Sequence, residues 1–272
     1  MPDTYPTPEP IQLYVRIPRG HIEVVATDTQ ETTVDVQRTD TRSASAVADD
    51  VRIEFRESRR TSGQLLVVVD KNRHSWFGKQ ATYEVRIETP HGADIDVVTA
   101  SADVMGTGRF DSVNVRTASG DVSFENVTDR ITIKSASGDL RVHESQGPVD
   151  LATTSGDIHV GAAGGRVSAA LVSGDFKVDT VADGVKARSV SGDLSIQAVE
   201  KGTVELTSVS GDAVVAVRPG KRVWMDLMSS SGDTFCELDG SDDGSSAGGA
   251  EVDIRVKTVS GDVRIVRAAA SL

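Results

Sequence analysis

The sequence predicts an all-β fold, a single-stranded β-solenoid (β-helix) of about 18-residue coils with an N-terminal β cap, from three observations. The tripeptide Ser-Gly-Asp recurs at nearly constant spacing, short alternating apolar runs follow it, and helical apolar periodicity is absent. Hydrophobic residues make up 38% of the 272 residues and aromatic residues only 4%, so aliphatic side chains must form most of the core.

The spacing of Ser-Gly-Asp is the strongest of these observations. A degenerate copy, Ser101-Ala102-Asp103, opens the series, and every step from Ser101 to Ser191 is 18 residues. The later steps lengthen to 19, 21 and 29 residues. Tandem repeats of this length form supersecondary units that bury their apolar face only by stacking on one another. The complete copies begin at Ser119, Ser137, Ser155, Ser173, Ser191, Ser210, Ser231 and Ser260.

Two alternating runs in each repeat predict two short strands. The first follows the aspartate, as in Val122-Ser123-Phe124 and Leu140-Arg141-Val142, and the second closes most units, as in Ile131-Thr132-Ile133. A period of two places alternate side chains on one face of a strand. The apolar face of each strand is therefore expected to point inward.

The tripeptide itself predicts a tight corner between strands, because Gly tolerates positive φ and Ser and Asp side chains bond nearby backbone groups. Stacking would align the aspartates in one column, where like charges repel by about 1 kcal/mol per pair in water. We expect hydrogen bonds from corner amides to offset this repulsion. The alternative is that the aspartate column binds calcium. One carboxylate per coil, however, supplies few of the oxygen ligands that calcium requires. The predicted structural corner comprises Gly120, Asp121, Gly138, Asp139, Gly156, Asp157, Gly174, Asp175, Gly192, Asp193, Gly211 and Asp212.

Residues 1–90 lack the repeat and are predicted to form an N-terminal β cap continuous with the solenoid of residues 91–272. A cap is needed because the end of a solenoid is an open sheet edge. Alternating runs predict strands at residues 13–17, 22–25, 33–36, 51–55, 65–69 and 83–87.

The C-terminal part departs from the repeat in two ways. Residues 238–250 are rich in Asp, Gly and Ser and predict an acidic loop. Ser260 to Val266 begins a coil that the chain does not complete. This last coil is expected to fray, to be covered by the tail, or to pair with another chain.

Partner contacts are predicted at two places, because aromatic and Arg side chains on exposed segments are typical of interfaces. Trp224 lies between Val223 and Met225 in an alternating run that points it outward. The other place is the loop of residues 71–80, between two predicted strands, which contains Trp76. The alternative for Trp76 is that it packs over the core of the cap. The candidate partner-binding residues are Arg73, His74, Trp76, Phe77 and Trp224.

No catalytic residue, cofactor-binding residue or metal ligand is predicted. The five histidines lie at no metal-ligand spacing, and no nucleophile elbow, phosphate loop or dinucleotide fingerprint occurs. The single cysteine, Cys236, occupies an inward slot and is expected to be a core residue. A net charge of −12 argues against nucleic acid. No run approaches the ~20 apolar residues of a membrane span and no signal peptide is evident, so we expect a cytoplasmic protein.

The repeat and its entry resemble the bacterial putative-adhesin β-strand-repeat family, a family of unknown function. The resemblance includes Gly20-His21-Ile22-Glu23-Val24 and the segment from Tyr83 to Ala93, and it extends from about Ile11 to Val266. It implies a β-solenoid and supplies no catalytic residues.

These observations together predict a non-enzymatic scaffold or interaction protein that binds protein partners or self-associates as a homo-oligomer. Two alternatives remain open. One is a carbohydrate-binding or carbohydrate-cleaving β-solenoid, with a glycan as ligand, and the other is a bactofilin-like protein that forms filaments.

Overall fold

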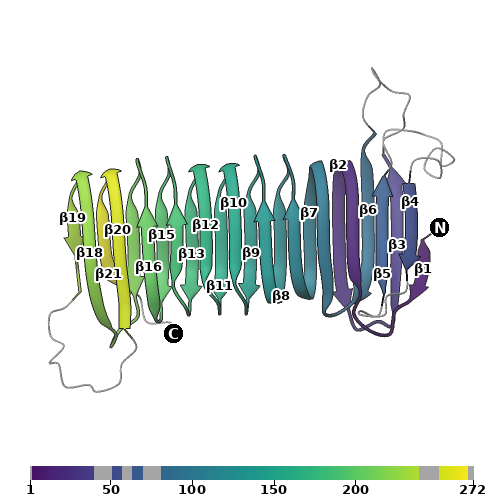
Figure 1. Cartoon of the computed structure of the whole chain (residues 1–272), viewed down its shortest axis with the longest axis horizontal. Helices are drawn as coiled ribbons and strands as arrows, with labels where there is room; N and C mark the ends of the chain where they lie inside the picture. The colour runs from purple at the N-terminus through teal and green to yellow at the C-terminus, as the bar shows by residue number, and fades with distance from the viewer. Residues whose placement is uncertain (1, 40–50, 57–62, 70–80, 239–250, 269–272) are drawn as a thin grey trace. The chain divides into compact units, whose positions relative to one another are not determined.

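The computed structural model describes residues 2–39, 51–56, 63–69, 81–238 and 251–268 (Figure 1). These residues form strands and turns, with no helix among them. The chain divides into two compact units, Met1–Gly138 and Asp139–Leu272. Within the described ranges, no segment is a helix that could cross a membrane.

The described part of the first unit consists of strands that follow the alternating runs of the sequence. All six runs predicted in residues 1–90 are strands, and the first two of them belong to one strand, β2. The strands are β1 (Asp3–Pro6), β2 (Gln12–Thr27), β3 (Glu31–Arg38), β4 (Val51–Arg56), β5 (Gln64–Val69), β6 (Tyr83–Pro90), β7 (Ala93–Arg116) and β8 (Val122–Lys134).

Strand β2 is enclosed by parallel neighbours that come later in the sequence. On one side it pairs with β7, with Leu13 opposite Ile95. On the other side its two halves pair with β5 and β6, with Leu13 opposite Leu65 and Ile22 opposite Val85. All these apolar side chains are buried. The first coil of the chain is therefore an interior one.

Antiparallel strands cover the outer side of β5 and β6. Strand β4 pairs with β5, β3 pairs with β6, and β1 pairs with β3. A chain of buried hydroxyl groups runs through this cover: Thr32 lies 2.8 Å from Thr7 and 3.3 Å from Thr89 between their Oγ1 atoms. The antiparallel strands therefore provide hydrogen-bond partners for buried polar groups as well as burying apolar side chains.

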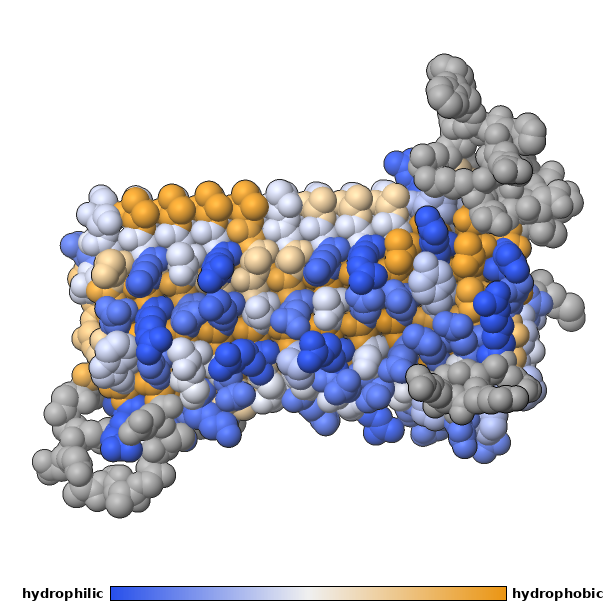
Figure 2. Space-filling model, in the orientation of Figure 1, coloured by the Kyte–Doolittle hydropathy of each residue, from blue (hydrophilic) through white to orange (hydrophobic). Residues whose placement is uncertain are grey.

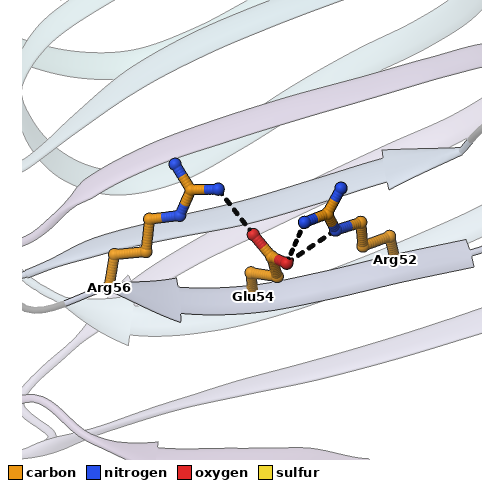
Figure 3. A network of polar contacts seen from close by, with 3 residues as sticks. All are labelled: Arg52, Glu54 and Arg56. Carbon is orange, nitrogen blue, oxygen red and sulfur yellow. Dashed lines mark hydrogen bonds and ion pairs between the residues drawn. The ribbon is translucent and has the colours of Figure 1, made fainter.

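Strand β4 carries charged side chains on its solvent face (Figure 3). The carboxylate of Glu54 accepts hydrogen bonds from the guanidinium groups of Arg52 and Arg56, the latter at 2.8 Å. The bonds from Arg52, and then those from Arg56, lower the pKa of Glu54 below its ordinary value. Charged side chains on an outer strand discourage edge-to-edge pairing with another sheet.

The second unit consists of parallel strands in two rows. Its described strands are β9 (Leu140–Ser145), β10 (Val149–Ser155), β11 (Ile158–Ala163), β12 (Val167–Ser173), β13 (Phe176–Val181), β14 (Val185–Arg188), β15 (Leu194–Val199), β16 (Gly202–Thr207), β17 (Ala213–Val217), β18 (Arg222–Ser231), β19 (Thr234–Cys236), β20 (Glu251–Ser260) and β21 (Val263–Arg267).

The register of these rows follows the repeat. Ile158 pairs with Phe176 and Val149 with Val167, each an 18-residue step, so equivalent apolar side chains stack. Stacked in this way they are fully buried, including the large side chain of Phe176. Parallel strands with an 18-residue step and a common inward face make the fold β-solenoid-like.

The last coil of the chain is not the last in space, and the expectation that the coil beginning at Ser260 is exposed at the end of the fold is wrong. Strand β20 lies between β16 and β18, and β21 lies between β17 and β19. The inward residues of β20 and β21 are accordingly buried, among them Ile254 and Ile265. The preceding coil, β18 and β19, takes the outer position because β20 and β21 separate it from β16 and β17.

Candidate functional site

The corners between strands stack on one another at contact distance. In the second unit, bridges join Ser173 to Ser191 and Ser191 to Ser210. Gly192 has a φ of 127°, and a Cβ at this position would lie 2.1 Å from the carbonyl oxygen of Gly174. Both the positive φ and the close approach require glycine. The same region of φ is found at all the predicted corner glycines: Gly120, Gly138, Gly156, Gly174, Gly192 and Gly211.

The corner aspartates form a ladder of hydrogen bonds. The backbone N–H of each aspartate donates to the Oδ1 atom of the aspartate in the neighbouring coil, at 2.8 to 3.0 Å. Such charge-assisted bonds offset the repulsion between stacked carboxylates. In the first unit the ladder joins Asp121 to Asp103. In the second it runs in spatial order through Asp139, Asp157, Asp175, Asp193, Asp212, Asp262 and Asp233.

A hydroxyl group completes most corners from within the same coil. The side chain two residues before the corner serine donates to that serine's carbonyl oxygen, at 2.8 to 3.3 Å. The corner at Ser173 has Leu171 at this position and no hydroxyl to donate. The donors are Thr117, Ser135, Thr153, Ser189, Ser208 and Thr258. The polar groups of the corner are therefore used largely in hydrogen bonds, the hydroxyls within a coil and the aspartates between coils.

Three carboxylates gather in the first unit, at Asp94, Asp111 and Asp129. Ser112 joins two of them: its backbone N–H donates to Asp94 and its hydroxyl to Asp129, each at 3.2 Å. Burial, and then the negative charge of Asp111, raises the pKa of Asp94 above its ordinary value. No set of three or more His, Cys, Asp or Glu side chains in the described ranges is arranged to hold a metal ion.

The outer coil of the second unit exposes apolar side chains at an unpaired sheet edge. Strand β18 pairs with β20 on its inner side, and no described strand pairs with its outer side. Trp224 is 56% exposed, Met228 54% and Phe235 43%. We call this surface of β18 and β19 the open end. Exposed aromatic and Met side chains beside free backbone groups are typical of protein interfaces.

Trp224 is held in place by the strand beneath it. The guanidinium group of Arg255 on β20 lies 5.5 Å from the centre of the Trp224 ring. Asp253 in turn bonds Arg255 at 2.8 Å. On the other row, Arg264 lies over the ring of Phe235 at 5.7 Å. Cation–π contacts of this kind orient aromatic side chains while leaving much of their surface to solvent.

A row of exposed valines runs along the corners of the second unit, and the sequence interpretation missed it. Apolar side chains form a continuous line along one edge of the surface in Figure 2. The row is continuous because coils stack at these corners: the backbone N–H groups of Ser191, Ser210 and Ser260 donate to the carbonyl oxygens of the valines in the adjacent coils, at 2.9 to 3.0 Å. The valine before Ser-Gly-Asp in three successive repeats, and again before Ser260, was the available signal. The members are Val172, Val190, Val209 and Val259.

The predicted contact residues are divided by the structure. Trp224 lies at the open end, whereas Arg73, His74, Trp76 and Phe77 lie outside the described residues, as does all of the acidic loop after Leu238. The prediction that Cys236 is a core residue is wrong, because its thiol is exposed. Cys236 belongs to the outer coil, where no further coil of the described residues covers the inward face, and its sulfur contacts Met225 at 3.9 Å.

Parallel strands, stacked corners and a repeat-derived register together define an all-β protein of the β-solenoid-like class. The chain belongs to the Toastrack DUF4097 family, whose profile matches residues 12–266. The comparison with curated proteins found no match.

Solved structures that match this chain share little sequence with it. A putative adhesin from Parabacteroides distasonis is 13% identical, covers 97% of this chain and 96% of its own, and has a TM-score of 0.51. A putative adhesin from Bacteroides fragilis is 12% identical with the same coverages and a TM-score of 0.46. A putative lipid binding protein from Parabacteroides distasonis is 10% identical, covers 97% and 96%, and has a TM-score of 0.41. At this identity the first of these shows the fold alone.

Proposed function

We propose that the chain is a non-enzymatic, adhesin-like interaction protein: a single-stranded β-solenoid of about 18-residue coils with an N-terminal β cap, which binds a protein partner through its open end. The observation that supports this most is the uncovered edge of β18 and β19, with Trp224, Met228 and Phe235 exposed beside it. The regular part of the fold serves as a rigid support for this surface.

The corner repeat offers less support for a function of its own. Each described ladder aspartate that accepts an amide hydrogen bond contributes one carboxylate oxygen to the stacking of coils. Catalytic sites usually interrupt a repeat with a local cluster of groups, whereas this ladder makes the repeat regular. An interaction surface is better placed where the repeat is incomplete.

The open end also has the composition of an interface. Its exposed side chains are Trp, Met and Phe, which are enriched at the centres of protein interfaces. The neighbouring Arg255 and Asp253 form an ion pair at the rim of this surface. A few buried aromatic anchors carry most of the binding energy in such surfaces, so Trp224 is expected to be the main contributor.

The test is a capture experiment with the full chain and two matched variants. Trp224→Lys places a charge at the open end, and Val172→Lys places the same charge on another exposed apolar residue, 48% exposed, on the valine row. We expect the set of captured proteins, including a differently tagged copy of the chain, to be lost with Trp224→Lys and kept with Val172→Lys. An unchanged set with Trp224→Lys would exclude the open end as the binding surface.

A glycan array and a turnover assay address the carbohydrate alternative. Specific binding to a sugar, or release of a cleaved product, would replace the interaction function with a carbohydrate-binding or carbohydrate-cleaving one. Electron microscopy of concentrated protein addresses the bactofilin-like alternative, because filaments would be visible directly.

A further inference from the structure

We propose that the partner at the open end is a second copy of this chain, joined by antiparallel pairing of β18 with the same strand of the second copy. The two-fold axis passes midway between the Trp224 residues of the two copies, which lie directly opposite one another. This inference rests on the proposed function, because it names the partner of the same surface. Four features of the open end lead to it: its backbone, its register, its charges and its composition.

The backbone of β18 is a template for one more strand. The strand is 10 residues long, and its inner side is fully used by β20 from Arg222 to Ser231. Its outer side presents N–H and C=O groups to solvent within the described part of the chain. A long edge with apolar side chains and no covering strand readily pairs with another chain. A closed two-fold pairing uses the same edge on both copies.

The side chains restrict the register of that pairing. Val223, Met225 and Leu227 face the interior of the coil but are only half-buried, because no further coil lies over them in the part of the chain that the structure describes. An added strand covers them only if its own inward residues lie opposite, since a one-residue slip exchanges the two faces of a strand. In a two-fold antiparallel pair, this condition holds only for registers centred on a residue, and excludes those centred between residues.

Charge then selects one of these registers. Centred on Trp224, the pairing places Arg222 of each copy opposite Asp226 of the other, and Val223 opposite Met225. Centred on Asp226, it opposes two carboxylates. Centred on Met225, it leaves Arg222 opposite an apolar side chain, Met228. The Trp224 register therefore forms two opposite-charge cross-strand pairs, which the other two do not.

Asp226 is suited to this role by its place in a column of charges. In register across β14, β16, β20 and β18 lie Lys186, Glu205, Arg255 and Asp226, with alternating sign. Lys186 and Glu205 form an ion pair at 2.5 Å, and Arg255 is bonded instead to Asp253. Asp226 thus ends the column, and no ion pair to it occurs among the described residues. The next group of the series is a cation, which Arg222 of a second copy supplies.

The composition of this chain's own neighbouring segment does not fit the apolar edge. Residues 239–250, which follow β19, contain only Asp, Gly, Ser and Ala. Such a segment has no side chain large enough to cover Trp224, Met228 and Phe235. A second open end has the same three side chains, and two copies bury them together.

The first experiment measures self-association by sedimentation equilibrium of the full chain, with charge-reversal variants. Arg222→Glu and Asp226→Arg each place like charges opposite one another in both symmetry-related pairs. We expect each to raise the dimer dissociation constant about tenfold. The double variant restores opposite charges and is expected to return the constant to within about twofold of wild type. Arg222 is exposed and Asp226 is half-buried, so circular dichroism of each variant checks that the fold is kept.

The second experiment tests the axis by disulfide trapping in a Cys236→Ser background. Residues directly opposite in antiparallel strands have Cα atoms about 4.5 to 5.5 Å apart, within the range of a disulfide. Loss of the Trp224 ring weakens the dimer, but oxidation traps the fraction that forms at high protein concentration, so Trp224→Cys is still expected to form a covalent dimer on mild oxidation. Met228→Cys is the matched control: it is equally exposed, but its two copies lie about 27 Å apart along the strands in this register.

The outcomes separate this inference from the function on which it rests. A dimer that responds to the charge swaps and is trapped at residue 224 supports both. A monomer at every concentration, with Trp224-dependent capture of a different protein, overturns the second copy as partner and leaves the interaction function standing. A dimer indifferent to the charge swaps, or trapped through Met228→Cys, overturns the register. A monomer without any Trp224-dependent capture overturns both proposals.

Discussion

The two terminal regions of the chain differ in how their outermost parallel strands are covered. In each, a coil near the end of the sequence is enclosed by parallel neighbours: β2 between β7 and the β5–β6 pair, and β20 with β21 inside β18 and β19. The two regions then differ in what lies beside their outermost parallel strands. Antiparallel strands cover β5 and β6, whereas no described strand covers β18 and β19.

The difference shows that burial in this fold depends on having a neighbour on both sides. Strands β5 and β6 keep a regular alternation, with buried residues between half-buried ones in β5 and between exposed ones in most of β6, because β3 and β4 lie beside them. Strand β18 has the same apolar alternation in its sequence, yet none of its residues is fully buried. The covered edge also carries Arg52, Glu54 and Arg56, whereas the uncovered edge carries Trp224 and Met228. One edge discourages pairing and the other favours it.

The largest predicted effect concerns the enclosed coil and its outer neighbour. Ile254 on β20 is fully buried, and Met225 lies next to it in register on β18. Ile254→Ala is expected to lower the free energy of unfolding by about 3 kcal/mol, because it leaves a cavity in the core. Met225→Ala, at the half-open position, is expected to cost about 1 kcal/mol. Urea denaturation of both variants measures this, and equal losses would contradict the enclosed position of β20.

A matched pair of valines compares the two edges directly. Val34 on the covering strand β3 is buried, and Val223 on β18 is half-buried. Val34→Ala is expected to lower the free energy of unfolding by about 2 kcal/mol and Val223→Ala by less than about 1 kcal/mol. Thermal unfolding of dilute protein gives both values. A larger loss at Val223 would mean that the open end is already covered in the free protein.

The hydroxyl chain of the covered edge gives a smaller predicted effect. Thr32→Val keeps the shape of the side chain but removes the group that joins Thr7 and Thr89. Leaving buried hydroxyls without this partner is expected to cost about 1 to 2 kcal/mol. Chemical denaturation measures the loss. A Thr32→Ser variant keeps the hydroxyl and serves as the control for its hydrogen bonds, so a Val variant as stable as wild type would show that the hydroxyl chain contributes nothing.

The smallest predicted effect is a pH dependence next to β2. The pKa of Asp94 is raised in the folded protein by burial and by Asp111, so the ionised form destabilises the fold above the folded pKa. Asp94→Asn, which retains an acceptor for the Ser112 amide, is expected to stabilise the protein slightly at neutral pH. The gain shrinks as the pH falls through the folded pKa and disappears below the unfolded one. Denaturation at pH 7 and pH 4 tests this; an equal gain at both would exclude Asp94 titration as its source.

Much of the regular fold could be predicted from the sequence, because each corner uses local chemistry. The 18-residue step, the inward apolar runs and the positive φ at glycine all follow from residue types and spacing, as at Gly192 and Val149. The open end also contains Trp224, which alternation alone points outward. These features depend on residues that are close together in the chain, so they can be recognised by comparing one repeat with the next.

The order of the last two coils could not be predicted in the same way. Both 222–236 and 251–267 carry the strand pattern, and the choice of which lies inside depends on packing against β16 and β17. The available signal was composition: the enclosed coil has Val252, Ile254 and Val256 inward on β20, whereas the outer coil has Met225 on β18 and Cys236 on β19. Branched aliphatic side chains fill a two-sided interior more regularly than Met. The chemistry of the partner likewise depends on a surface that only the coil order creates.

Hydrogen–deuterium exchange across a range of protein concentrations tests the role of the open end most directly. In dilute solution the amides of β18 are expected to exchange faster than those of β20, and rising concentration is expected to slow exchange in β18 and β19 while leaving β3 and β4 unchanged. The contrary result is exchange in β18 that does not depend on concentration, or protection that appears at β4 instead. That result would place self-association away from the open end or exclude it.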